Sequence, residues 1–170
     1  MSWTFTLPAL FLLTLAAWRD VATRTIPNAA CGALAALGVT LRATEGWYAL
    51  GVSVAVAALM FLVLLLCHAR GLLGGGDVKL LTALALGLPP LASWDLVVAT
   101  SLVGGGLALL YLVMQRLPSS RLTLPVRIGG NTLHRVLAVE SWRIRRRGPM
   151  PYGVAIAIGA AIVLLQAQEG

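Results

Sequence analysis

The sequence predicts an all-α polytopic membrane protein, and three observations carry that prediction. Hydrophobic residues make up 59% of the 170 residues and charged residues only 11%, whereas a soluble domain carries roughly a quarter charged residues. Apolar runs long enough to cross a bilayer recur along the chain, and the basic residues gather between alternate runs. A soluble enzyme is therefore excluded, and the net charge of +7 indicates basic cytosolic loops rather than a nucleic-acid partner.

Six helices follow from the apolar runs. The first lies behind Trp3 and is expected to be retained, because no basic segment precedes it as in a secretory signal. A crossing needs about 20 residues, and the runs Pro27–Leu41 and Val78–Leu88 are shorter than that. These two helices are therefore expected to cross only in part or to extend into their loops. Pro27 is expected in the first turn of the second helix, and Pro89-Pro90 is expected to stop the fourth. The remaining runs are Trp47–Cys67, Trp94–Gln115 and Met150–Gln166, and the short ones are Pro27–Leu41 and Val78–Leu88.

The basic residues predict the orientation. With the N-terminus outside, 12 of the 13 lysines and arginines lie in the three cytosolic loops, and only Arg42 lies outside. We expect one integral membrane domain over residues 1–170, with residues 116–149 as a basic cytosolic loop inside it. Within this loop, Asn131–Trp142 is amphipathic and is predicted to lie on the membrane surface, with its arginines at anionic headgroups.

Two of the six acidic residues, Asp20 and Asp77, lie at cytosolic helix ends. An ionisable group near hydrocarbon is a candidate for function, although Asp20 also fits a solvated loop and Asp77 a helix N-cap. Glycines at Gly74, Gly75 and Gly76 allow positive φ and close backbone approach. Two carboxylates in one pocket share a proton and form an acid and base pair. The aspartates are 57 residues apart, so only the fold can join them.

At these residues the chain resembles the type IV prepilin leader peptidases, which are aspartic peptidases with a GxGD motif. Three patches carry the resemblance, in order and on a consistent topology. They are Asp20 followed by Arg24 and Ile26-Pro27-Asn28, then Gly74-Gly75-Gly76-Asp77-Val78-Lys79, and finally Pro151-Tyr152-Gly153-Val154 at the start of the last helix.

The resemblance implies that Asp20 and Asp77 are the catalytic dyad of a membrane-embedded endopeptidase in the bacterial inner membrane. It implies cleavage of a short basic leader after glycine, on the cytosolic side, from prepilins and pseudopilins. The chain lacks the paired CxxC motifs of the larger members, so it looks like the short, peptidase-only form of tight-adherence (Flp) pilus systems. Methyltransfer is therefore not expected, and no cofactor is.

The other candidate residues support the pocket. Lys79 is expected to lower the pKa of a carboxyl group, to meet an acidic group of the substrate, or to reach the membrane surface. Pro27 and Asn28 accompany Asp20. Pro151, Tyr152 and Gly153 shape the pocket rim or simply start a helix. Cys67 and His68 precede the glycines, but without a third well-spaced ligand no metal is predicted.

Two other functions compete with the peptidase. A small proton-coupled transporter would place charges near the bilayer midplane, yet the interiors of the long runs carry none, namely Val52–Leu66, Val97–Leu112 and Val154–Leu165. A noncatalytic pilus-assembly subunit remains open, although it leaves both acids and the glycines without an evident use. The sequence leaves the oligomeric state open.

Overall fold

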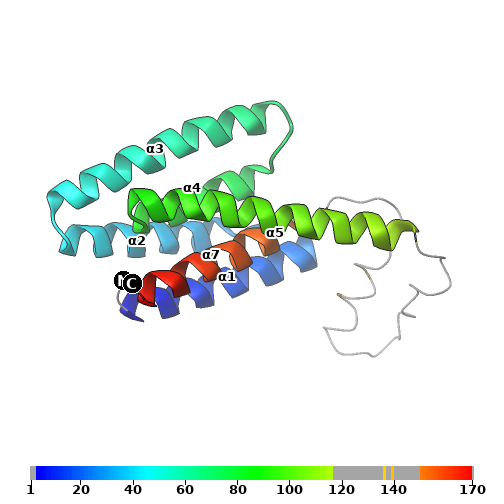
Figure 1. Cartoon of the computed structure of the whole chain (residues 1–170), viewed down its shortest axis with the longest axis horizontal. Helices are drawn as coiled ribbons and strands as arrows, with labels where there is room; N and C mark the ends of the chain where they lie inside the picture. Colours follow the sequence, from blue (N-terminus) through cyan, green and yellow to red (C-terminus); the bar gives the residue numbers. More distant parts are fainter. Residues whose placement is uncertain (1–2, 117–135, 137–138, 140–149, 170) are drawn as a thin grey trace.

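The computed structural model describes residues 3–116 and 150–169, together with Val136 and Val139. This part of the chain is helical and contains no strand, which confirms the predicted fold class (Figure 1). The predicted surface helix over Asn131–Trp142, apart from these two valines, and most of the basic loop lie outside the described residues. The helices are α1 (Trp3–Thr23), α2 (Asn28–Thr44), α3 (Trp47–Ala69), α4 (Gly75–Gly87), α5 (Pro90–Arg116) and α7 (Tyr152–Glu169).

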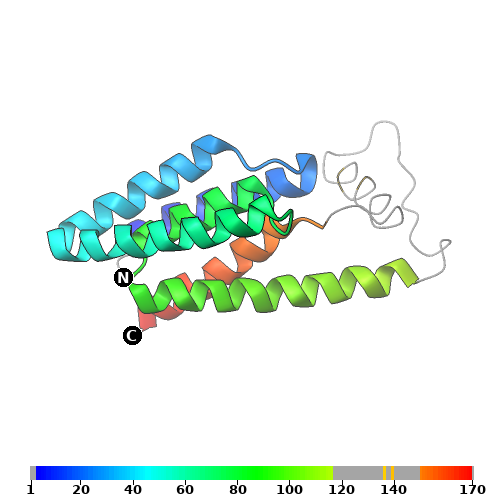
Figure 2. The ribbon, with the colours of Figure 1, turned by 90° about the horizontal axis from the view of Figure 1, so that it is seen from above.

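The helices run up and down, each antiparallel to the one before it. The start of α1 and the end of α7 lie at the same end of the bundle in both views (Figures 1 and 2). The α1–α2 and α3–α4 connections lie at the opposite end, where α7 also begins. One end of the bundle therefore gathers every segment on which the sequence placed a candidate site residue.

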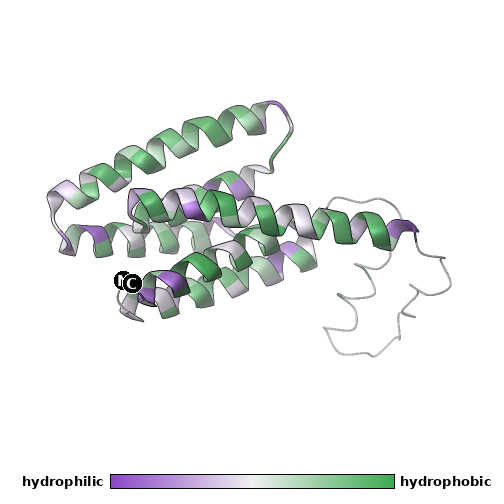
Figure 3. Ribbon diagram, in the orientation of Figure 1, coloured by the Kyte–Doolittle hydropathy of each residue, from purple (hydrophilic) through white to green (hydrophobic). Residues whose placement is uncertain are grey.

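Three helices are long and apolar enough to cross a membrane, namely α1, α3 and α5, and α7 is a shorter apolar helix. Large apolar side chains point away from the bundle, among them Trp47, which is 83% exposed, and Trp94, which is 67% exposed. Apolar residues cover most of each helix, and the hydrophilic ones lie mainly near the helix ends (Figure 3). In water such a surface would be costly, whereas in a bilayer it meets lipid.

The short helix α4 occupies the centre of the bundle. Seven of its residues are buried, and it packs against α2, α3, α5 and α7. A helix that is apolar on all sides belongs inside a larger assembly. This enclosure explains how a 13-residue helix, too short to reach across a hydrocarbon core of about 30 Å, is kept in an apolar bundle.

The α2–α4 crossing depends on two glycines. A Cβ atom built on Gly38 would lie 2.6 Å from the backbone nitrogen of Gly87, and one on Gly87 would lie 2.5 Å from the ring of Phe5. The two backbones therefore touch without side chains between them, as in the small-residue contacts of membrane helices. This close approach joins the later half of α2 to the last residue of α4.

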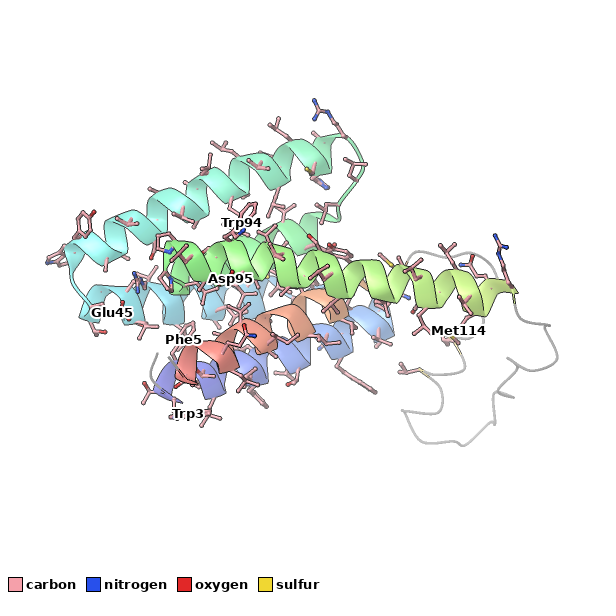
Figure 4. The ribbon with its side chains drawn as sticks, viewed as in Figure 1. Trp3, Phe5, Glu45, Trp94, Asp95 and Met114 are labelled. Atoms are coloured by element: carbon pink, nitrogen blue, oxygen red, sulfur yellow. The ribbon has the colours of Figure 1, made fainter. Side chains whose placement is uncertain are left out.

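A buried polar network closes the other end of α2. The Nε atom of Arg42 donates to Ser53 Oγ at 2.8 Å, and that hydroxyl donates to the Leu88 carbonyl at 3.1 Å. Arg42 also pairs with Glu45, which Figure 4 labels near the end of α2. The one basic residue that the sequence placed outside is thus a buried link between α2, α3 and the end of α4.

Several helix boundaries differ from the sequence prediction, and two of these differences involve glycine or proline. The fourth helix begins at Gly75 rather than Val78, because Gly75 and Gly76 take helical conformation. The fifth begins at Pro90 rather than Trp94. Proline suits this position because an N–H group in the first turn has no partner within the helix, so its absence costs nothing. The fourth helix ends at Gly87 with Leu88 as its C-cap, directly before Pro89 and Pro90.

Candidate active site

A cavity of about 590 Å³ lies at the end of the bundle where α1, α4 and α7 meet. The α1–α2 connection, the α3–α4 loop and the start of α7 each contribute to its wall. All three sequence patches therefore meet at one hollow. Its lining residues are Asp20, Arg24, Gly71, Leu72, Leu73, Gly74, Asp77, Met150 and Tyr152.

Asp20 lies in the last turn of α1 and is only 7% exposed. The backbone N–H of Gly153 donates to its Oδ2 atom at 2.8 Å. Any side chain on Gly153 would collide with the acid, because a Cβ atom there would lie 2.9 Å from Oδ2 and 3.1 Å from Cγ. Gly153 thus gives Asp20 both a hydrogen-bond donor and the room to reach it.

Asp77 is the third residue of α4, and Gly74 occupies the N-cap position before that helix. The N-cap reading of Asp77 is therefore wrong. Its backbone N–H donates to the Gly74 carbonyl at 3.1 Å. Gly74 has no room for a side chain, because a Cβ atom there would lie 2.8 Å from Asp77 Oδ2.

The environment of Asp77 favours its protonated form. Burial, and after it the charge of Asp20, raise the pKa of this carboxyl from 3.8 to about 6, and a backbone hydrogen bond with Gly74 opposes this rise. Asp77 lies in the first turn of α4, outside the three helices that are long enough to cross a bilayer. The two carboxyls therefore differ, one held by an N–H donor and one disposed to keep a proton.

The glycines before Asp77 serve close approach rather than positive φ. Gly74 has φ −71°, and Gly75 and Gly76 are helical. The positive φ in this loop belongs to Gly71, at 73°. A Cβ atom on Gly76 would lie 3.2 Å from the Cβ atom of Ile26, so Gly76 admits the α1–α2 connection against the start of α4.

Lys79 and Asn28 lie together, outside the aspartate cavity. The Nζ atom of Lys79 donates to Asn28 Oδ1 at 3.1 Å. Both residues line a separate groove of about 400 Å³ between α2 and α4. Pro27 is the N-cap of α2, and its carbonyl accepts from the N–H groups of Ala30 and Cys31.

The start of α7 completes the cavity wall. Pro151 is buried, and its carbonyl accepts from the N–H of Val154. Tyr152 lines the cavity with its ring against Gly104 of α5, where a Cβ atom would lie 2.8 Å from Tyr152 Cε2. Nothing in the sequence around Gly104 indicates that this glycine makes room for Tyr152.

The described residues include no cluster of three or more potential metal ligands. His68, one of the residues weighed for a metal, instead places Nδ1 at 2.8 Å from the Leu73 carbonyl. Its ring lies 3.4 Å from the position of a Cβ atom on Gly75. His68 thus contacts the glycine loop without facing the cavity that holds the aspartates.

Arg24 also lines this cavity, although the sequence prediction assigned it no role. Its φ of 57° is the one positive value at a non-glycine among the described residues. Left-handed backbone costs an L-residue about 1–2 kcal/mol, and such strain tends to gather at functional sites.

Comparison with protein families matches residues 7–109 to the family described as Type IV leader peptidase family. The match spans more than half of the chain and includes Asp20 and Asp77, whereas Gly153 lies beyond it. No curated protein and no solved structure shows a significant match. The chain therefore belongs to the type IV leader peptidase family, which makes it a membrane-embedded peptidase with prepilin-type substrates.

Proposed function

We propose that this protein removes the short basic leader from Flp-type prepilins and pseudopilins at the cytosolic face of the bacterial inner membrane. The observation that carries the proposal is the cavity into which α1 and α4 bring Asp20 and Asp77 from 57 residues apart. The proposed topology has six helices in the membrane, the N-terminus outside, and the cavity end of the bundle in the cytosol. Twelve of the thirteen basic residues then lie on the cytosolic side.

The two carboxyls fit complementary roles in peptide hydrolysis. Asp20, stabilised as a carboxylate by the Gly153 N–H, takes a proton from water as the general base. Asp77, whose pKa is raised to about 6, gives a proton to the peptide carbonyl oxygen as the general acid. Paired carboxyls with different proton affinities are the usual means of acid and base catalysis near neutral pH.

The remaining candidate residues support this dyad. Gly74 and Gly153 leave room for the two carboxyls, and Gly75 and Gly76 let His68 and Ile26 approach the loop. Pro151 and Tyr152 form the rim beside Asp20. Pro27, Asn28 and Lys79 lie behind the cavity, where they connect α2 to α4.

The buried charges argue against a transporter. Among the described residues, the buried charged side chains are Asp20 and Arg42, and both lie near helix ends rather than at mid-helix. A proton-coupled carrier instead places ionisable groups near the bilayer midplane. A noncatalytic assembly subunit is separated from a peptidase by the cleavage assay below.

The test is cleavage of a purified Flp-type prepilin by the purified protein in lipid nanodiscs. Mass spectrometry is expected to show a product that begins immediately after the leader glycine. Added S-adenosylmethionine should leave this product unmethylated. A matched prepilin with valine in place of that glycine should stay intact. An uncleaved glycine-site substrate would contradict the proposed function and favour a transporter or an assembly subunit.

A further inference from the structure

We propose that Lys79 and Asn28 form a positioning pair that sets the separation of Asp20 and Asp77. This inference rests on the proposed two-aspartate mechanism. The hydrogen bond from Lys79 Nζ to Asn28 Oδ1, 3.1 Å long, joins residues 51 positions apart. Lys79 follows Asp77 by two residues in α4, and Asn28 is the first residue of α2, directly after the connection from α1, which carries Asp20. The bond therefore joins the two segments that carry the acids.

Lys79 extends away from the acids. Successive helical residues turn by about 100°, so residues 77 and 79 lie on nearly opposite sides of α4. Asp77 lines the aspartate cavity, whereas Lys79 lines the groove that also contains Asn28, Cys31 and Phe61. Its ammonium group is thus placed to hold α2 rather than to contact a peptide in the cavity.

A second contact works beside this hydrogen bond. Ile26 packs against Gly76, where even a Cβ atom would lie 3.2 Å from the Cβ atom of Ile26. Pro27 stands between the two contacting residues with φ −63°, which its ring holds fixed. Ile26, Pro27 and Asn28 therefore form a short stiff segment that touches α4 on either side of Asp77 in the sequence, at positions 76 and 79.

Two contacts of a stiff segment fix both the rotation and the height of the first turn of α4. These two quantities decide where the Asp77 carboxyl stands relative to Asp20. Because the Lys79 and Asn28 side chains are exposed, losing their bond should leave the helix bundle folded. A misplacement of about 1 Å in a catalytic group can cost about 100-fold in rate, so the loss should appear in catalysis.

The test compares Lys79→Met, Asn28→Ala and the double variant in the prepilin cleavage assay. Each single variant is expected to lower kcat about 10- to 100-fold with KM and the melting temperature nearly unchanged. The double variant should be no slower than the slower single variant, because both remove the same contact. Asn28→Asp keeps an acceptor for Lys79 and should restore most of the rate. Arg70→Met, which removes an exposed cation at the end of α3, is the control with wild-type kcat.

The pH profile separates positioning from a direct effect of the Lys79 charge. The groups that line the cavity with Asp77 are Asp20, Arg24 and Tyr152, and His68 lies against Gly75. If the pair sets the spacing, both single variants move the two apparent pKa values of the rate closer together, because separated carboxylates repel less. A direct charge effect would move both values upward in Lys79→Met and leave Asn28→Ala unchanged.

An unchanged kcat in Asn28→Ala, or additive losses of rate in the double variant, would overturn the positioning pair. The proposed peptidase function would still stand in that case, because the wild-type protein cleaves the prepilin. Failure of the wild-type protein to cleave prepilin would overturn both proposals. If Lys79→Met melts early, the comparison of Asn28→Ala with Asn28→Asp decides the question.

Discussion

The backbone N–H of Gly153 donates to Asp20 Oδ2 at 2.8 Å, which joins the first helix to the last across 133 residues. The acid is buried, and the glycine is the residue type that lets the last helix approach it. The last helix therefore donates a hydrogen bond to Asp20 in addition to packing against α1. This contact makes the start of α7 part of the proposed catalytic apparatus.

Gly153→Ala should disable the enzyme without unfolding it. The added Cβ atom would lie 2.9 Å from Asp20 Oδ2, so the carboxylate must turn away from the N–H that stabilises it. We expect kcat for prepilin cleavage to fall at least 10-fold. Gly105→Ala is the matched control, because nothing lies within 4 Å of its Cβ position. Equal rates for the two alanine variants would contradict the role of Gly153.

The stability of the protein should depend on pH through Asp77. Its pKa is higher in the folded state, about 6, than its ordinary value of 3.8, so the folded state binds more protons between these values. Stability therefore falls as pH rises from about 4 to about 6. Asp77→Asn should raise the melting temperature in lipid nanodiscs at pH 7.5 more than at pH 4.5.

Asp95→Asn, which replaces an exposed carboxyl, is the control for this measurement and should show no such difference. The rate of cleavage by the wild-type protein should also fall as pH rises through about 6, because the general acid loses its proton. A melting difference for Asp77→Asn that is the same at both pH values would show that the protonation of Asp77 is not linked to folding.

Gly38→Ala should strongly destabilise the bundle. The new methyl group would lie 2.6 Å from the Gly87 nitrogen and 2.8 Å from its Cα atom. Backbone cannot move aside as a flexible side chain can, so α2 and α4 must separate. We expect a loss of about 1–3 kcal/mol, as for an overpacked core. Gly32→Ala in the same helix meets nothing within 4 Å, and it should melt at or above the wild-type temperature. Equal melting of the two variants would contradict the close crossing.

The helices could be predicted because long apolar runs have few alternatives in a membrane protein. Their ends were harder to predict, because glycine and proline act in more than one way. Gly75 and Gly76 were expected to allow positive φ and instead form the helical first turn of α4. The proline pair was expected to stop the fourth helix, and Pro90 also starts the next one. Arg42 was counted as an outer charge, whereas its burial depends on Ser53, in another helix.

The candidate acids could be found because the chain has few acidic residues and because these two lie at helix ends. Their surroundings could not be predicted, because hydrogen bonds such as Lys79 to Asn28 and Gly153 to Asp20 span 51 and 133 residues. The role of Lys79, at a carboxylate or at the membrane surface, was left open, and nothing in the sequence indicated Asn28 as its partner. Gly104 carries no local sign that Tyr152 packs on it. Such contacts follow from how the helices pack, which apolar patterning alone does not specify.

The most direct test of the central claim is prepilin cleavage by purified Asp20→Asn and Asp77→Asn variants. Asparagine keeps the shape of the side chain but removes its ability to exchange a proton at neutral pH. The two-aspartate account predicts that both variants remain folded in nanodiscs and form no shortened product, while Asp95→Asn cleaves at the wild-type rate. Cleavage at the wild-type rate by either Asp20→Asn or Asp77→Asn would contradict it.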